Sequence, residues 1–194
     1  VARLGELLDA PVGKPALIHI PQELIEGQSQ YFEGIEVKIA HGSLFIPNCQ
    51  DSWELIATSE PENRLRIVLL ATLYGWLVAS DHQFLFTNTP PRLIYSVDHG
   101  HFFPNPPNWQ IKDLQDSINV DLDPYFQDCN FNQNELQQAL QKLSNISELD
   151  LLKTVAIIPQ EWGFPMEDRL AMLKFLKIRK NRLLEVLDRK ILEF

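Results

Sequence analysis

Hydrophobic positions recur with a helical period in some parts of the chain and with a strand period in others. Residues 1–11 place apolar side chains on one helical face, at Val1, Leu4, Leu7 and Leu8. Apolar or alternating runs then predict short strands at 16–20, 35–40 and 43–47. The front of the chain is therefore expected to hold one helix and a small antiparallel sheet.

From about residue 50 the pattern is mainly helical. Pro61 opens a segment that is apolar nearly all round as far as Ala79, which predicts a buried helix. Capping pairs and a long apolar stripe predict three more helices, over 132–143, from Ser147 onward and over 166–191. Between the sections, the proline-rich stretch 103–109 predicts an ordered loop whose Trp109 lines a pocket.

Two Asp-His pairs stand at the two ends of a predicted hairpin. Asp81-His82 precedes one apolar run and Asp98-His99 follows the next. With a four-residue loop at 88–91, Asp81 falls directly opposite Asp98, where Cβ atoms are about 4.5–5.5 Å apart. Two carboxylates that close repel each other unless a cation lies between them, and Mg²⁺ is the natural candidate because it takes carboxylate and phosphate oxygens. A bulge in the ladder would break this register.

Two other interpretations of this segment stay open. Acidic residues gather at strand ends simply because turns there are solvated, but these two acids adjoin apolar runs and Gly100 lets the backbone approach a ligand closely. Alternatively, His82, His99 and His101 together with the aspartates suit Zn²⁺ or Fe²⁺. The chain lacks a further well-spaced set of His or Cys, so the transition-metal site is the less favoured alternative.

Composition narrows the classes of function. The net charge of −9 opposes nonspecific binding to nucleic acid or to an anionic membrane. With no secretory signal, Cys49 and Cys129 predict reduced thiols in a cytoplasmic protein. No apolar run approaches the roughly 20 residues that a membrane span needs. We therefore expect a cytoplasmic protein that binds neither nucleic acid nor a membrane.

Several stretches of the chain, in order, resemble the HipA-like kinase family, a protein-kinase-like group related to the phosphoinositide kinases. They are ARLGELLDAPVGKPALIHIPQELI at 2–25, HGSLFIP at 41–47, the SDH and DHGHFF segments at 80–103, and IPQEWGFPMEDRLAMLKFLKIRKNRL at 158–183. The resemblance implies an α+β, protein-kinase-like fold in a single domain over 1–194. Residues 1–50 would be a small antiparallel front-lobe remnant and hinge, and residues 51–194 a mainly helical C-terminal lobe.

The resemblance assigns a catalytic loop to the first Asp-His pair. The family's loop reads roughly Asp-Arg-His-x-x-Asn, and its Asp orients or deprotonates the substrate hydroxyl. Asp81 and His82 match the Asp and the His, with the Arg missing. The metal-binding Asn falls on Leu85 or Phe86, neither of which can bind a metal, and Asn88 belongs to the predicted turn.

The resemblance assigns cofactor binding to the second Asp-His pair. Asp98 matches the family's metal-binding aspartate and opens a segment continued by His99, Gly100 and His101. The implied cofactors are Mg²⁺ and ATP, with Asp98 and Asp81 as the metal ligands.

The chain also departs from the family at its front. The strands that carry the family's phosphate-binding Lys have no counterpart, and Lys14 and Lys38 stand in the wrong context. One lost contact of this kind costs about 3–4 kcal/mol of barrier. The missing part lies outside this sequence, comes from another chain, or has been lost together with catalysis. A protein partner or a second copy of the chain is expected to cover the incomplete front lobe.

The leading expectation is a HipA-like, kinase-related protein in which phosphotransfer is reduced or absent. If the chain is active, it is an ATP- and Mg²⁺-dependent phosphotransferase. A non-catalytic interaction module on the same fold is the first alternative. A metal-dependent hydrolase built on His82, Asp98, His99 and His101 is the second.

Overall fold

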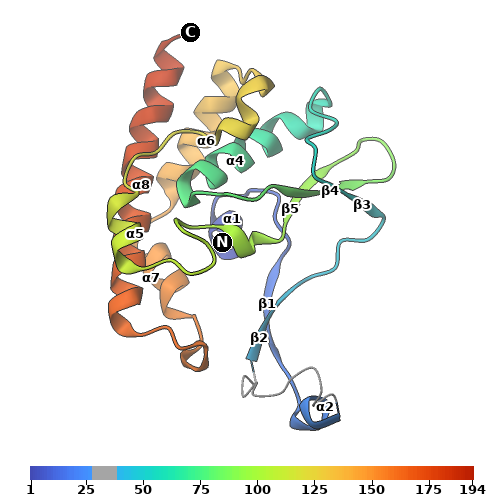
Figure 1. The fold of residues 1–194 in the computed structure, drawn as a ribbon. Coiled ribbons are helices and arrows are strands. Elements are labelled where there is room, and N and C mark those ends of the chain that lie inside the picture. The colour runs from blue at the N-terminus through green and yellow to red at the C-terminus, as the bar shows by residue number, and fades with distance from the viewer. Residues whose placement is uncertain (28–38) are drawn as a thin grey trace.

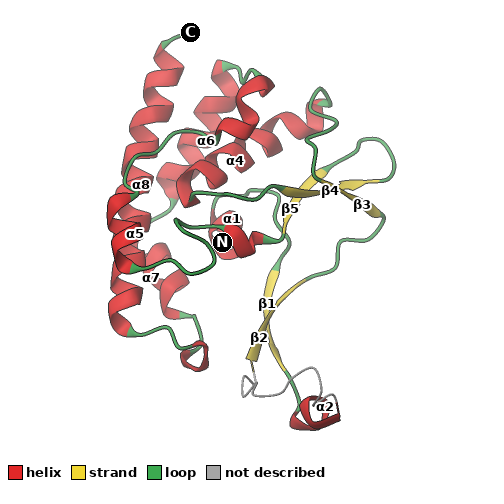
Figure 2. Cartoon of the chain, in the orientation of Figure 1, coloured by secondary structure: helices red, strands yellow, loops and turns green. Residues whose placement is uncertain are grey.

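The computed structural model describes residues 1–27 and 39–194 and has a mixed α+β architecture, as expected. Apart from the short helix at Gln22–Gly27, which lies beyond the strands, the helices gather on one side and the short antiparallel strands on the other (Figure 2). None of the described helices is long and apolar enough to cross a membrane. The elements are α1 Ala2–Leu7, β1 Pro15–His19, α2 Gln22–Gly27, β2 Ile39–Ser43, β3 Cys49–Ser52, α4 Pro61–Leu77, β4 Gln83–Thr87, β5 Ile94–Val97, η1 His99–His101, α5 Ile111–Asp116, η2 Pro124–Cys129, α6 Gln133–Asn145, α7 Glu148–Ala156, η3 Gln160–Trp162 and α8 Met166–Leu192.

Helix α4 is the buried centre of the helical side. Every residue from Ile67 to Leu77 is buried, because the sequence is apolar on all faces there. Helices α6 and α8 and the turn η2 pack against it, and α8 extends along the outside of the helical side (Figure 1). The predicted buried helix from Pro61 is confirmed, and it ends at Leu77, where Val78 takes a left-handed backbone conformation (φ 58°).

The rear helices begin at the capping residues that the sequence predicts. Asn132 Oδ1 accepts the Glu135 N–H at 3.0 Å, and the Glu135 carboxylate accepts the Asn132 N–H at 2.9 Å. Ser147 and Asp150 make the same reciprocal pair at the start of α7. Each pair satisfies backbone donors that a helix leaves free at its first turn.

The predicted hairpin is present, but its predicted register is wrong by one residue. Strands β3, β4 and β5 form an antiparallel sheet in that order, and Phe84 pairs with Ser96. The turn spans 88–92 instead of 88–91, since the Thr87 N–H bonds to the Leu93 carbonyl at 3.1 Å. Continued outward, this ladder would set Asp98 opposite His82 and not opposite Asp81.

The front strands differ from expectation in two places. Strands β1 and β2 form a two-stranded antiparallel ribbon that projects from the rest of the chain (Figure 1). The strand predicted at 35–40 lies largely outside the described residues, and the strand predicted at 43–47 is wrong. After Leu44 bonds to the Lys14 carbonyl the chain leaves the ladder, and Phe45 is 82% exposed. Strand β3, which the sequence did not reveal, straddles the expected boundary at residue 50.

A buried arginine joins α8 to the end of α4. Arg179 is 3% exposed, and its guanidinium donates to four backbone carbonyls at 2.5–2.7 Å. The acceptors are Gly75 and Trp76 at the end of α4 and Ser117 and Asn119 after α5. The carbonyls at a helix C-terminus carry partial negative charge and attract a cation. No carboxylate is needed to satisfy this guanidinium.

Replacing Arg179 with methionine is expected to lower the free energy of unfolding by about 3 kcal/mol or more. The change leaves several buried carbonyls without a donor, and each stranded group costs about 1–3 kcal/mol. Urea denaturation at equilibrium measures the loss. Arg189→Met, on an exposed position of the same helix, is the control and should stay within about 0.5 kcal/mol of the wild type. Equal effects of the two substitutions would contradict a special role for Arg179.

Candidate functional site

The structure brings the two Asp-His segments together at one end of the β4–β5 hairpin. Asp81 lies just before β4, and Asp98 directly follows β5. The Ser80 N–H and Oγ both donate to the His101 carbonyl, at 3.1 and 2.8 Å. These bonds tie the chain entering the hairpin to the chain leaving it. The two acids therefore share one end of the sheet, although they do not face each other across the ladder.

His82 is held by a buried acid and by an aromatic ring. Its Nε2 lies 3.0 Å from Oδ1 of Asp123, a residue only 6% exposed that also caps η2. The imidazole stacks on Tyr125, with ring centroids 4.3 Å apart and planes 16° apart. Asp81 Oδ1 accepts the His82 backbone N–H at 2.9 Å. The contacts that hold His82 therefore also fix the position of the Asp81 carboxylate.

Asp98 has no comparable support within the described residues. It adopts a left-handed backbone (φ 50°), its side chain is exposed, and no hydrogen bond joins its carboxylate to another described residue. A Cβ added at Gly100 would meet only Asp98 Oδ1, at the ordinary contact distance of 3.5 Å. Packing inside the protein thus does not require glycine at this position. With no hydrogen-bond partner among the described residues, both carboxylate oxygens of Asp98 could bind a cation.

His99 ends a buried chain of hydrogen bonds that starts on α4. The hydroxyls of Tyr74 and Ser96, both fully buried, lie 2.5 Å apart, and Ser96 Oγ lies 2.8 Å from His99 Nε2. Burial lowers the pKa of His99 to about 3, so the ring is neutral at pH 7. Its Nε2 is thereby engaged inside the protein. His101, by contrast, is exposed.

A cavity of about 590 Å³ lies beside these residues. Its lining includes Gly13, Ser43, Asp98, His99 and Trp109, and so brings the predicted loop tryptophan to the site. No lysine or arginine appears among the described residues that line it. Phosphate groups placed here would therefore lack a lysine or arginine partner.

The other residues considered from the sequence lie elsewhere. Lys14 is exposed at the start of β1, and Lys38 is outside the described residues. Phe86 is fully buried in the core, whereas Asn88 donates its backbone N–H to the Asn48 carbonyl at the turn end of the hairpin. Neither position supplies an amide side chain to the end that carries Asp81.

Sequence reasoning missed four residues of the site: Tyr74, Ser96, Asp123 and Tyr125. Ser96 carried a signal, because it is a polar residue at an inward-facing position of an alternating strand. It follows the buried Ile94 by two residues, and Phe102 further along the chain is also part of the core. Asp123 precedes Pro124, which indicates a helix start, but no sequence pattern links it to His82.

Comparison of the chain with protein-family models, with curated proteins and with solved structures gives no match. The site therefore has to be interpreted from its own geometry.

The neutral state of His99 predicts a specific loss of stability in acid. Its folded pKa of about 3 lies below the ordinary 6.5, so the unfolded chain binds the proton more readily. The contribution of His99 to the free energy of unfolding is thus fully present above pH 6.5. It is lost as the pH drops toward 3, at up to about 1.4 kcal/mol per pH unit. Thermal unfolding between pH 4 and pH 8 should show this slope in the wild type and a shallower one in His99→Gln.

The exposed His101 provides the control for this titration. His101→Gln removes a histidine two residues away without touching the buried chain, so its pH profile should match that of the wild type. Identical slopes for the wild type and His99→Gln would show that His99 titrates normally in the folded protein.

Proposed function

We propose that the chain is a HipA-like, kinase-related protein on a protein-kinase-like α+β fold, with phosphotransfer reduced or absent. The observation that carries the proposal is the meeting of the two Asp-His segments at one end of the β4–β5 hairpin, where Asp98 and His99 line a cavity. In the same sheet, the expected asparagine position is occupied by the buried Phe86 or its neighbour Leu85. The free thiols of Cys49 and Cys129 support a cytoplasmic location.

The acidic residues fit a magnesium–nucleotide complex better than a metal held by protein alone. Mg²⁺ is commonly bound through one or two carboxylates, with phosphate oxygens and water completing the octahedron. Asp98 offers two oxygens that no other described residue engages, and Asp81 retains Oδ2 while its Oδ1 accepts the His82 N–H. When bound, the ion would offset phosphate charge. Asp81, held in place through His82 and Asp123, would orient an acceptor hydroxyl.

The missing groups account for the reduced activity in this proposal. A lysine that grips the phosphates and an amide that binds the second metal each lower the barrier by electrostatic stabilisation. The lining of the Asp98 cavity supplies neither among the described residues. Nucleotide can still bind through its metal, but transfer of the phosphoryl group loses its main stabilising contacts.

An interaction module is the second candidate, and exposed apolar side chains favour it. Phe45 is 82% and Trp53 60% exposed, and both lie on the strand side of the chain. A protein partner or a second copy could bury them. The metal-dependent hydrolase gains no support, because the described residues contain no group of three or more His, Cys, Asp or Glu side chains placed to hold a metal.

Magnesium–ATP is expected to raise the melting temperature of the wild type and not that of Asp98→Asn. A ligand at a hundredfold excess over its Kd stabilises the folded state by about 2.7 kcal/mol, or about 5–10 °C for a chain of this size. The substitution removes the carboxylate that would hold the metal and keeps its shape. Thermal unfolding with millimolar Mg–ATP measures both proteins.

Two controls separate this outcome from nonspecific effects. Asp188→Asn removes one exposed carboxylate on α8 and should keep the full shift of the wild type. ATP with EDTA should give a smaller shift than Mg–ATP. No shift in the folded wild type, or an equal shift in Asp98→Asn, would remove the nucleotide from the proposal and leave the interaction module.

A further inference from the structure

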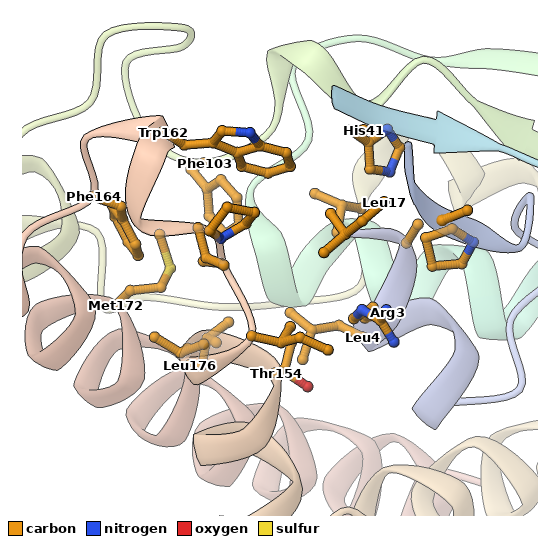
Figure 3. A pocket seen from close by; sticks show the side chains of 18 of the residues that line it. Arg3, Leu4, Leu17, His41, Phe103, Thr154, Trp162, Phe164, Met172 and Leu176 are labelled. Carbon is orange, nitrogen blue, oxygen red and sulfur yellow. The ribbon is translucent and has the colours of Figure 1, made fainter. Parts of the chain in front are cut away.

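A second cavity, of about 350 Å³, lies between α1, the β1–β2 ribbon and the connector from α7 to α8 (Figure 3). Its size falls in the range of about 300–1,000 Å³ that is typical of small-molecule sites. Asp81, His82 and Asp98 are not part of its lining. The cavity adjoins the Asp98 cavity, with which it shares His41, Phe103 and Trp109, but it contains none of the proposed metal ligands, so its ligand need not be the nucleotide.

Specific contacts hold two of its walls in place. The Trp162 indole N–H donates to the Ile39 carbonyl at 2.7 Å and so fastens the α7–α8 connector to the ribbon. Trp109 meets Phe164 edge to face, with ring centroids 5.8 Å apart. These contacts join segments far apart in the sequence. The space is thus formed before any ligand enters it.

The body of the cavity is apolar and rich in aromatic rings. Phe103, Trp109, Trp162 and Phe164 all contribute to the lining. Some apolar lining remains open to water, as Leu17 is 44% exposed. Aromatic walls favour a planar ring, which they can contact both by face and by edge. A ligand ring would also cover apolar surface that is otherwise left in water.

The polar groups of the lining gather at one side. Figure 3 shows Arg3 and His41 on the side opposite Phe164 and Met172. Burial lowers the pKa of His41, and the nearby charge of Arg3 adds to this, so His41 is mainly neutral at pH 7. No carboxylate of the described residues forms an ion pair with Arg3. A guanidinium fork matches a carboxylate, to which it can donate two parallel hydrogen bonds.

We propose that this cavity binds a small aromatic monocarboxylate, with its ring among Trp109, Trp162 and Phe164 and its carboxylate on Arg3. At about 30 Å³ per water-sized group, the volume holds a ligand of roughly a dozen non-hydrogen atoms. A phenyl ring with a short acid chain meets this limit. The proposal goes beyond the nucleotide site and does not depend on it.

Calorimetric titration with 3-phenylpropionate and with its neutral amide, 3-phenylpropionamide, tests the proposal on the unmodified protein. The two probes share a shape and differ in charge. The acid should bind with a Kd below about 1 mM, and the amide about tenfold more weakly, because it loses a charge-assisted bond. Failure of the acid to bind at about 5 mM, or equal affinities for acid and amide, would overturn the assignment.

Matched variants locate the binding. Arg3→Gln should weaken the acid about tenfold and leave the amide unchanged, whereas Arg189→Gln makes the same change in net charge outside the lining and should alter neither. Ala16→Leu adds volume to the cavity wall and should weaken both probes. Unchanged affinities in Arg3→Gln and Ala16→Leu would place any binding elsewhere. Decanoate that binds more tightly than the aromatic acid would refute the preference for a ring.

Discussion

The burial of the Arg179 guanidinium among backbone carbonyls is the constraint on which the helical side depends. No carboxylate among the described residues pairs with the buried Arg179, and burial lowers its pKa to about 10, so it stays cationic at neutral pH. Such a charge is tolerated only because four carbonyls point at it from two separate segments. The Trp76 indole N–H adds a reverse bond to the Leu176 carbonyl at 2.9 Å. Together these bonds fix the end of α4 against α8.

The position of α4 in turn sets the geometry of the hairpin. At its start, the Asn63 side chain donates to the Arg92 carbonyl at 2.7 Å and accepts the Ile94 N–H at 3.0 Å, which holds β5 in place. Nearer its end, Tyr74 contacts Ser96 and lies under the rings of His82 and Phe102. Helix α4, strand β5 and the rings of His82 and His99 therefore belong to one packed unit. The candidate site is a property of the core and not of a loose surface loop.

The sequence predicted the parts of this arrangement that depend on local pattern, and failed where distant contacts decide. Capping pairs and the apolar segment after Pro61 identified helices, because propensity and periodicity act within one element. The hairpin register failed by one residue, because the turn 88–92 is longer than its composition suggested. The Asp123 clamp on His82 joins residues 41 positions apart, and a single sequence carries no signal for such a pair.

The two aspartates differ in what the fold itself requires of them. Asp81 belongs to a clamp with a structural role, since Tyr125, which stacks on His82, also donates its hydroxyl to the Trp53 carbonyl at 2.7 Å and so ties η2 to the strand side. These contacts would explain the position of Asp81 even in a protein with no catalytic activity. Asp98 is exposed, unbonded among the described residues, and in a left-handed conformation that aspartate adopts more readily than most residues. Contacts among the described residues therefore explain the position of Asp81, whereas none of them engages the carboxylate of Asp98.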